Sequence, residues 1–205
     1  MTHIQDSTIL LVDDNADNLN VLLDYLDSAG FRVLVAQNGY NAIQQLQYVL
    51  PDLILLDIRM PGIDGFETCR RLKTDERTKE IPVIFLTALS DIVDKINGFE
   101  AGGVDYITKP FQHEEVFARV NAHLTIVKQR QQLQALNAKK DKFFSILAHD
   151  LRSPYLAFLD FIRLFTEHID RQSREEIKKI AYSARDTAEN LYALLENLLT
   201  WSRFQ

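Results

Sequence analysis

Three acidic residues stand where two apolar runs of the sequence end, and they are the first candidates for chemistry. Asp13 and Asp14 directly follow Ile9–Val12, and Asp57 directly follows Leu53–Leu56. Short apolar runs bounded by turn residues are typical of strands buried in a parallel sheet, whose carboxyl ends place ligands. Carboxylates that crowd together repel one another and need a divalent cation, and oxygen ligands suit Mg²⁺. The pattern therefore predicts a Mg²⁺ site formed by these three acids.

A hydroxyl and an ammonium group complete this candidate site. Thr87 ends another apolar run, and Lys109 follows a further, weaker one. Mg²⁺, a lysine and a hydroxyl around one carboxylate can hold a phosphoryl group, which Asp57 would accept as an acyl phosphate. Each of these residues alone could merely cap a helix or lie in a solvated loop, so the prediction depends on the whole set.

The elements that must position these residues alternate along the chain up to Pro110. Apolar runs predict strands at 9–12, 33–35, 53–56, 83–86 and 104–107, and the segments between them predict helices near 16–29, 39–49, 64–73 and 92–101. Strands that alternate with helices imply right-handed crossovers and a parallel sheet. We therefore expect an α/β fold with a doubly wound, five-stranded parallel sheet. Asn15 or Asp17 could cap the first helix, and Gly30 would end it.

The sequence changes character after Pro110, where glycine is absent and the next proline is Pro154. Phe111 to about His168 is predicted to form one long helix. The apolar residues in its middle part fit two heptad registers that are offset from each other. We interpret residues 112–145 as a helical coiled-coil linker with a local irregularity, and a solvated single helix is the alternative. The first register holds Val120, Leu124 and Val127, and the second holds Leu133, Leu136, Phe143 and Leu147.

Two runs with apolar residues at alternating spacings of four and three predict a helical hairpin within 138–205. A polar turn at His168–Arg174 would join the two helices. Each helix has one apolar seam, and two copies of the hairpin would bury both seams in a dimeric four-helix bundle. Pro154 should remove one backbone hydrogen bond and bend the first helix. The seams consist of Leu147, Leu151, Pro154, Phe158, Phe161 and Phe165 in the first helix, and Ile177, Ala181, Ala184, Ala188, Leu191, Leu195 and Leu198 in the second.

Size and composition exclude several classes of protein. The 205-residue chain is long enough for one well-packed domain and a smaller unit, and its single cysteine, Cys69, rules out an intramolecular disulfide. No apolar run approaches the length of a membrane span, and the first residues lack the layout of a signal peptide, so we expect a cytoplasmic protein. Residues 1–120 contain 19 acidic and 10 basic side chains, and residues 121–205 contain 10 and 13, so neither part favours nucleic-acid binding.

Residues 7–125 resemble the receiver domain of bacterial response regulators. The matching segments are Leu10–Asp14, Asp57–Gly65, Thr87–Ala88 and Gly103–Phe111. The resemblance implies a receiver domain at 1–125 with a flavodoxin-like sheet of strand order 2-1-3-4-5. It also implies that a partner histidine kinase or phosphotransfer protein donates the phosphate, and that the peptide bond before Pro110 is cis.

The resemblance further implies a role for each residue around the phosphoacceptor. Asp14, helped by Asp13 through water, would bind Mg²⁺, and the backbone carbonyl of Arg59 would be a further ligand. Thr87 would be the switch hydroxyl that moves in to bond the phosphoryl group. Tyr106 would be the switch aromatic that turns into the space that Thr87 leaves.

Residues from about 138 to 205 resemble the dimerisation and histidine phosphotransfer hairpin of sensor histidine kinases, through an H-box at Phe143–Tyr155. The heptad register places His149 farthest from the seam, so its ring should point outward. By the resemblance, His149 accepts phosphate from ATP, while the adjacent Asp150 orients the ring and takes its proton. Two residues depart from the usual pattern. Asp150 replaces the commoner Glu, and Ser153 stands where Thr or Asn is usual in members that also dephosphorylate a partner.

The two resemblances together favour a fragment of a histidine kinase whose N-terminal receiver regulates His149 on a homodimeric bundle. Such a kinase needs an ATP-binding domain, and no Gly-rich nucleotide motif occurs before Gln205, so we expect that domain to be missing from this chain. The alternative is a complete phosphorelay adaptor in which His149 and Asp57 exchange phosphate with partners without ATP. A scaffold with inactive sites is a third hypothesis, and a DNA-binding output is not expected.

Overall fold

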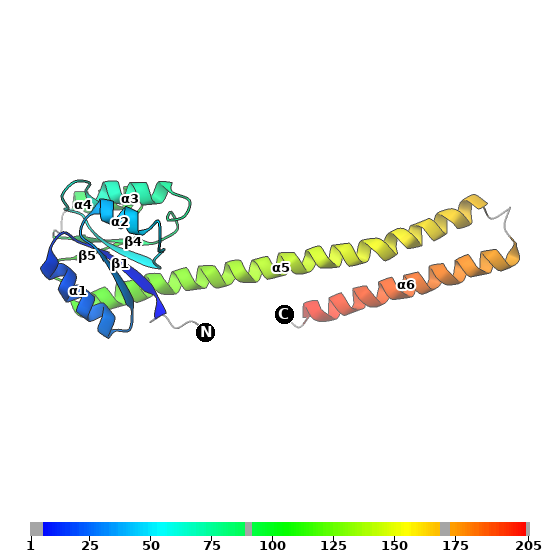
Figure 1. The fold of residues 1–205 in the computed structure, drawn as a ribbon. Helices are drawn as coiled ribbons and strands as arrows, with labels where there is room; N and C mark the ends of the chain where they lie inside the picture. Colours follow the sequence, from blue (N-terminus) through cyan, green and yellow to red (C-terminus); the bar gives the residue numbers. More distant parts are fainter. Residues whose placement is uncertain (1–5, 89–91, 169–172, 204–205) are drawn as a thin grey trace. The chain divides into compact units, whose positions relative to one another are not determined.

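The computed structural model describes residues 6–88, 92–168 and 173–203 of the chain. It divides into two compact units, Met1–Gln132 and Leu133–Gln205. The first unit contains a mixed arrangement of strands and helices, and the second is purely helical (Figure 1). Each unit is described separately below.

A five-stranded parallel sheet forms the centre of the first unit. Its strand order is β2-β1-β3-β4-β5, which confirms the predicted doubly wound, flavodoxin-like fold. The register places Val12 beside Leu56, and Asp57 beside Leu86, so the carboxyl ends of the central strands lie at one edge. The strands are β1 (Thr8–Val12), β2 (Arg32–Ala36), β3 (Leu53–Asp57), β4 (Val83–Thr87) and β5 (Asp105–Thr108).

Helices cover both faces of this sheet (Figure 1). One apolar core joins the sheet to α1 and to the first part of α5, through Leu22, Leu26 and Val120. The other joins the opposite face to α2 and α3, through Ala42 and Leu72. The helices are α1 (Ala16–Ser28), α2 (Gly39–Gln45), α3 (Gly65–Thr74), α4 (Ile92–Glu100), α5 (His113–His168) and α6 (Arg174–Arg203).

Local signals explain where α1 and α2 begin and end. Asn15 caps α1, because its side-chain oxygen accepts hydrogen bonds from the backbone N–H groups of Asp17 and Asn18 at 2.8 and 3.3 Å. Gly30 adopts a φ of 92° just beyond the end of that helix, as expected. The predicted helix 39–49 was too long, since α2 ends at Gln45. Gln47 and Tyr48 form tighter i→i−3 bonds after it, and Pro51 disfavours helical backbone in the residue that precedes it.

The long helix and the second helix of the prediction are both present. Val120 and Leu124, which fit the first heptad register, are fully buried against the sheet of the first unit. Leu133 and Leu136 of the second register have 59% and 60% of their surface exposed. Pro154 lies inside α5 without ending it. A coiled-coil role for residues 112–145 therefore stays a prediction.

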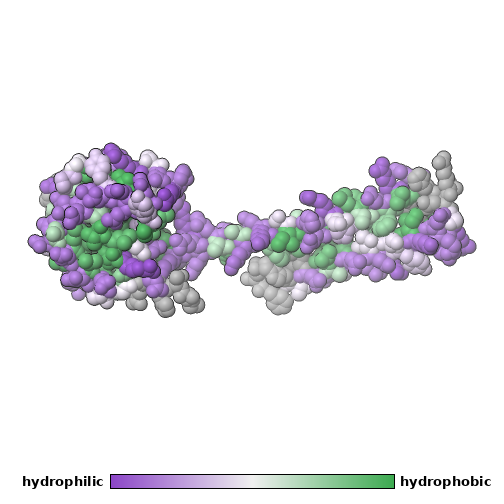
Figure 2. Space-filling model, in the orientation of Figure 1, coloured by the Kyte–Doolittle hydropathy of each residue, from purple (hydrophilic) through white to green (hydrophobic). Residues whose placement is uncertain are grey.

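The second unit pairs the last part of α5 with α6, and apolar residues gather along this hairpin (Figure 2). The first seam is confirmed, because Leu147, Leu151, Pro154, Phe158 and Phe161 are its half-buried members. The second seam is confirmed at Ile177, Ala184, Ala188 and Leu191, which are half-buried, and it departs from the prediction at two positions. Ala181 is exposed whereas Ile180 is half-buried, and Leu195 is 40% exposed. The side chains of Phe165 and Leu198, and most of the predicted turn at 168–174, lie outside the described residues.

A capping box starts α6. The Ser173 backbone N–H and hydroxyl both donate to the Glu176 carboxylate at 2.8 Å, and the Ser173 hydroxyl accepts from the Glu176 N–H at 3.3 Å. This reciprocal arrangement satisfies two donors at the helix start. It explains why α6 begins at Arg174, three residues before its first seam residue, Ile177.

Candidate functional site

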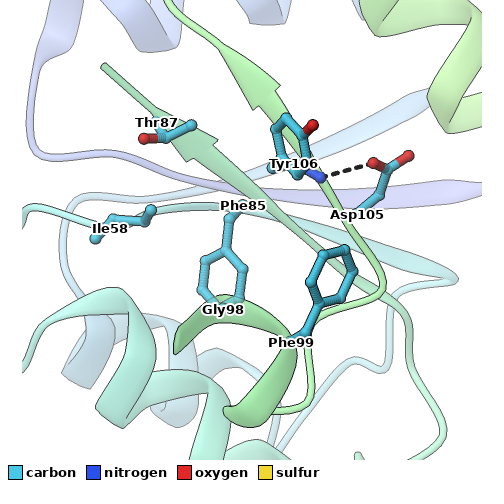
Figure 3. Close-up of a pocket in the computed structure, with 7 residues that line it drawn as sticks. All are labelled: Ile58, Phe85, Thr87, Gly98, Phe99, Asp105 and Tyr106. Atoms are coloured by element: carbon cyan, nitrogen blue, oxygen red, sulfur yellow. Dashed lines mark hydrogen bonds between the residues drawn. The ribbon is translucent and has the colours of Figure 1, made fainter. Parts of the chain in front are cut away.

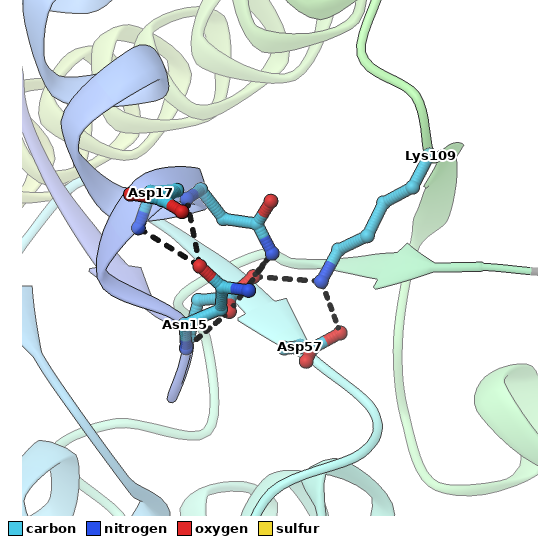
Figure 4. Close-up of polar contacts among 6 residues, drawn as sticks. Asn15, Asp17, Asp57 and Lys109 are labelled. Carbon is cyan, nitrogen blue, oxygen red and sulfur yellow. Dashed lines mark hydrogen bonds and ion pairs between the residues drawn. The ribbon is translucent and has the colours of Figure 1, made fainter.

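The structure brings the predicted acids and the lysine together at the carboxyl edge of the sheet. Asp13 directly follows β1, Asp57 is the last residue of β3, and Lys109 directly follows β5. The Lys109 ammonium lies 2.7 Å from Asp13 Oδ2 and 3.0 Å from Asp57 Oδ1. Figure 4 shows the lysine side chain reaching across to Asp57 from the end of its strand. One cation therefore bridges two carboxylates that come from different strands.

The three carboxylates at this site outnumber the single ammonium group, and two of them are buried. Asp13 is completely buried and Asp57 is 6% exposed, while Asp14 is exposed beside them. One oxygen from each of the three carboxylates lies within 4.8 Å of the others. Three acids and a single ammonium leave a net negative charge, and an oxygen donor set of this kind fits Mg²⁺. The residues present thus fit the predicted metal.

The pKa values of the bridged groups reflect the same crowding. Burial raises the pKa of Asp57, the hydrogen bond from Lys109 lowers it, and the charge of Asp13 raises it again, so that it ends above its usual value. Burial alone would lower the pKa of Lys109, but its hydrogen bonds to Asp13 and Asp57 outweigh burial and raise it. The lysine therefore stays charged, and a cation among the carboxylates would favour ionised Asp57.

A small cavity lies beside Thr87, between the end of β4, β5 and α4 (Figure 3). Thr87 is the last residue of β4 and only 4% exposed. Tyr106 lies on β5 and is half-buried. The structure thus places both predicted switch residues on the wall of one cavity, and their movements stay a prediction. The cavity is lined by Ile58, Phe85, Thr87, Gly98, Phe99, Asp105 and Tyr106.

The loop after β3 approaches the site closely because two glycines allow it. A Cβ atom on Gly65 would lie 2.3 Å from the carbonyl oxygen of Asp57, and Gly62 has a φ of 88°. The Gly65 N–H donates to the carbonyl of Ile58 at 2.9 Å, which fixes the turn. Arg59 lies in this loop with its side chain exposed, and the use of its carbonyl as a ligand stays a prediction. The Lys109–Pro110 peptide bond is cis, as expected.

A family model for the response regulator receiver domain matches residues 9–121, more than half of the chain. The chain belongs to this family. The receiver domain therefore accounts for the first unit up to the early part of α5, and phosphotransfer signalling is the class of function that it implies.

Individual relatives agree with this assignment. The DNA-binding dual master transcriptional regulator RpaA of a Synechocystis species is 47% identical over 116 residues, covering 57% of this chain and 48% of that protein. The receiver domain of a signal transduction histidine kinase from Syntrophus aciditrophicus superimposes with a TM-score of 0.56 at 37% identity, over 60% of this chain and 92% of that one. The chain spans about half the length of RpaA.

A third relative is the receiver domain of a sensor histidine kinase from Pseudomonas aeruginosa, solved with a magnesium ion coordinated in its active site cleft. It is 33% identical, with a TM-score of 0.56, over 58% of this chain and 98% of that one. Its receiver thus shares the fold described here.

Sequence reasoning missed a charged network beside Tyr106 in the receiver domain. Asp105 accepts from Arg119 at 2.7 and 2.9 Å and contacts His123 at 3.2 Å. The Arg119 guanidinium also lies 5.5 Å from the centre of the Tyr106 ring and pairs with Glu115. Only the i, i+4 spacing of Glu115 and Arg119 was visible in the sequence. The network links Tyr106 to α5.

Sequence reasoning also missed Asn18, whose side-chain amide donates to both oxygens of Asp13 at 3.2 and 3.1 Å. Its position one turn beyond the paired acids was the only available signal. Because this contact depends on a side chain that turns back from α1 toward the end of β1, residue type alone does not predict it.

The second unit presents the predicted phosphoacceptor at its surface. The His149 side chain is 83% exposed, which agrees with its predicted position away from the seam. Its Nδ1 atom lies 3.1 Å from Asp150 Oδ1. Ser153 is exposed on the same helix. No helix among the described residues is long and apolar enough to cross a membrane.

Proposed function

We propose that the receiver domain accepts a phosphoryl group on Asp57 and uses it to regulate the helical unit that follows. The observation that carries this proposal is the position of the Lys109 ammonium, 2.7 Å from Asp13 and 3.0 Å from Asp57. A purely structural cluster would not bury two carboxylates beside a third acid with a single lysine to balance them, because buried like charges are costly. The arrangement makes sense if a cation and then a phosphoryl group enter it.

The receiver's own residues would carry out the transfer as follows. An Asp57 carboxylate oxygen attacks the phosphorus of a phosphohistidine on a partner protein, so that a P–O bond forms and the P–N bond breaks. The partner's imidazole leaves and takes up a proton from water. Lys109 stays between Asp13 and the new acyl phosphate and offsets part of the added negative charge. Mg²⁺ held by Asp14, Asp57 and the Arg59 carbonyl, with Asp13 acting through water, would supply further charge neutralisation.

The signal would pass through the cavity next to Thr87. A phosphoryl group on Asp57 offers new acceptor oxygens, and the Thr87 hydroxyl moves toward them. Tyr106, which borders the same cavity, then turns inward. The free energy for this switch is the difference in phosphate contacts between the two states.

The second unit would then be the dimerisation and phosphotransfer hairpin of a histidine kinase. The outward ring of His149 and its contact with Asp150 support this role. If the Nδ1–H donates to Asp150, the Nε2 lone pair is free to attack a phosphorus atom. Homodimerisation would cover the exposed apolar side chains of the hairpin, such as Leu156 and Ile162. ATP would be bound by a separate domain of the same kinase.

A phosphorelay adaptor is the second candidate, favoured by the presence of an exposed histidine and a receiver site in one chain. In that case phosphate passes between His149, Asp57 and partner proteins without ATP. The length of the native reading frame separates the two candidates, because only the kinase requires an ATP-binding domain beyond Gln205. The DNA binding named for RpaA is not part of either candidate.

The chemical stability of the bound phosphate tests the proposal. The full chain is incubated with a phosphorylated histidine phosphotransfer protein and Mg²⁺, and the label is then exposed to acid, base and hydroxylamine. We expect a label on Asp57 that base and hydroxylamine remove, and that is absent from Asp57→Asn but present in His149→Ala. A label that survives in Asp57→Asn with unchanged yield and stability would refute the assignment of Asp57.

A further inference from the structure

The Asp13 carboxylate is enclosed, and its hydrogen-bonding capacity is fully used. The side chain has 0% of its surface exposed. Its Oδ1 atom accepts from the Asn15 backbone N–H at 2.9 Å and from the Asn18 amide at 3.2 Å. Its Oδ2 atom accepts from the same amide at 3.1 Å and from Lys109 at 2.7 Å. Because an ionised carboxylate has about four lone-pair sites, these four contacts occupy them.

The neighbouring acid is in a different environment. Asp14 is exposed, and within the described ranges no donor forms a hydrogen bond with its carboxylate. Yet both acids contribute an oxygen to the same cluster with Asp57. The cluster therefore combines one acid whose lone pairs are occupied with another that is open to a cation.

Asn18 is the residue that creates this difference. It is half-buried at the third position of α1, and its backbone N–H is held by the cap residue Asn15 at 3.3 Å. The cap fixes the first turn of the helix, and the Asn18 amide then lies against Asp13. The amide is neutral, so it occupies lone pairs of Asp13 without cancelling the charge of that acid.

We propose that Asn18 is a positioning residue that keeps Asp13 out of direct contact with the cation and so favours Mg²⁺ over Ca²⁺. The inference rests on the proposed magnesium site. Asp13 then contributes its charge through water. Mg²⁺ keeps several waters in a near-octahedral shell, whereas Ca²⁺ gains from additional protein oxygens, since it takes about six to eight oxygen ligands. Freeing Asp13 should therefore help Ca²⁺ more than Mg²⁺.

Calorimetric titration of the metal-free full chain with MgCl₂ and with CaCl₂ tests this selectivity. Asn18→Leu replaces the amide by an apolar group that is branched at the same carbon, and Asn18→Ala removes it with a residue that favours helix. Asn20→Leu is the matched control, because Asn20 is an exposed asparagine of the same helix. We expect the ratio of the Ca²⁺ to the Mg²⁺ dissociation constant to fall by roughly fivefold in both Asn18 variants. This is less than the roughly tenfold or larger change that follows when a direct metal ligand loses its hydrogen-bond partner, because Asp13 acts through water. The ratio should not change in Asn20→Leu.

A double variant separates positioning from simple stabilisation of the helix start. In an Asp13→Asn background, Asn18→Leu should no longer change the ratio, because the acid on which it acts is gone. Equally weakened binding of Mg²⁺ and Ca²⁺ in the Asn18 variants, or any other result that leaves the ratio of their dissociation constants unchanged, would overturn the inference. If the wild-type chain binds neither ion, the proposed magnesium site fails and the inference fails with it. If the wild-type chain binds Mg²⁺ but the Asn18 variants leave the ratio unchanged, this inference is refuted and the proposed magnesium site is not.

Discussion

Replacing Lys109 by methionine removes the one ammonium that joins Asp13 and Asp57 while keeping a long apolar side chain. The two lost contacts measure 2.7 and 3.0 Å, and the lysine side chain is only 19% exposed, so solvent screens them weakly. Removing one partner of a buried ion pair costs about 3–5 kcal/mol. Part of this is offset, because burying the ammonium had its own cost and Asp57 can take up a proton. We therefore expect the free energy of unfolding of the metal-free receiver to fall by about 2–4 kcal/mol at pH 7.

The loss should depend on Mg²⁺ and on pH in defined directions. Mg²⁺ bound among the carboxylates replaces part of the missing positive charge, so it should restore more stability to Lys109→Met than it adds to the wild type. The pKa of Asp57 is already raised, and removal of Lys109 raises it further. The stability lost on replacing Lys109 is therefore largest at pH values above the pKa of Asp57, where its carboxylate is ionised. The loss becomes smaller as the pH falls through that pKa and the carboxylate takes up a proton.

Pulse labelling of the single cysteine along a urea gradient measures this stability for the receiver alone. Cys69 is fully buried in the receiver core, so its thiol reacts with a disulfide reagent only after that core opens. Lys73→Met is the matched control, because Lys73 is a half-buried lysine that donates to the carbonyls of Lys79 and Ile81, outside the acid cluster. The stability that Lys73→Met loses should be the same with and without Mg²⁺. An unchanged or increased stability in metal-free Lys109→Met would refute the electrostatic reasoning.

Three further predictions follow from the described contacts. Gly65→Ala should lower the free energy of unfolding by about 2 kcal/mol in the same urea assay, because its Cβ would lie 2.3 Å from the Asp57 carbonyl oxygen; full stability would contradict the close approach. Burial raises the pKa of the Cys69 thiol to about 11, so its labelling rate in native buffer should follow the rate of unfolding, and fast labelling would disprove its burial. Burial would raise the pKa of Asp105, but hydrogen bonds from the Tyr106 N–H, Arg119 and His123 lower it below its usual value. The ionised Asp105 carboxylate therefore stabilises the fold at pH values above the pKa that it has in the unfolded chain, and this stabilisation is lost as the pH falls through the lowered pKa. Arg119→Met should therefore cost more stability at pH 7 than at pH 3, and an equal cost at both would refute this network.

The elements of the receiver were predictable because apolar runs and turn residues act locally. Leu53–Leu56 is fully buried in the structure, as a run without polar interruption requires. The convergence of Asp13, Asp57 and Lys109 also followed, since parallel strands end at one edge. The strand order itself came from the family resemblance. Spacing alone does not determine which strand lies beside which.

Contacts that cross between elements were not predictable. The hydrogen bonds from Asn18 to Asp13, and from Arg119 to Asp105, depend on how side chains turn from α1 and α5 toward the sheet. One position of the second hairpin seam was also assigned wrongly, because Ile180 and Ala181 are neighbours that both fit an apolar stripe. Packing against α5 selects between them, and this information is not local to the sequence of α6.

The dependence of Asp57 phosphorylation on Mg²⁺ tests the central claim most directly. The full chain is treated with acetyl phosphate, with Mg²⁺ or with a chelator, and its intact mass is recorded beside that of Asp57→Asn. The account predicts one added phosphoryl group in the wild type with Mg²⁺, and none with the chelator or in Asp57→Asn. Phosphorylation of the wild type to the same extent without Mg²⁺, or of Asp57→Asn to the same extent as the wild type, would contradict it.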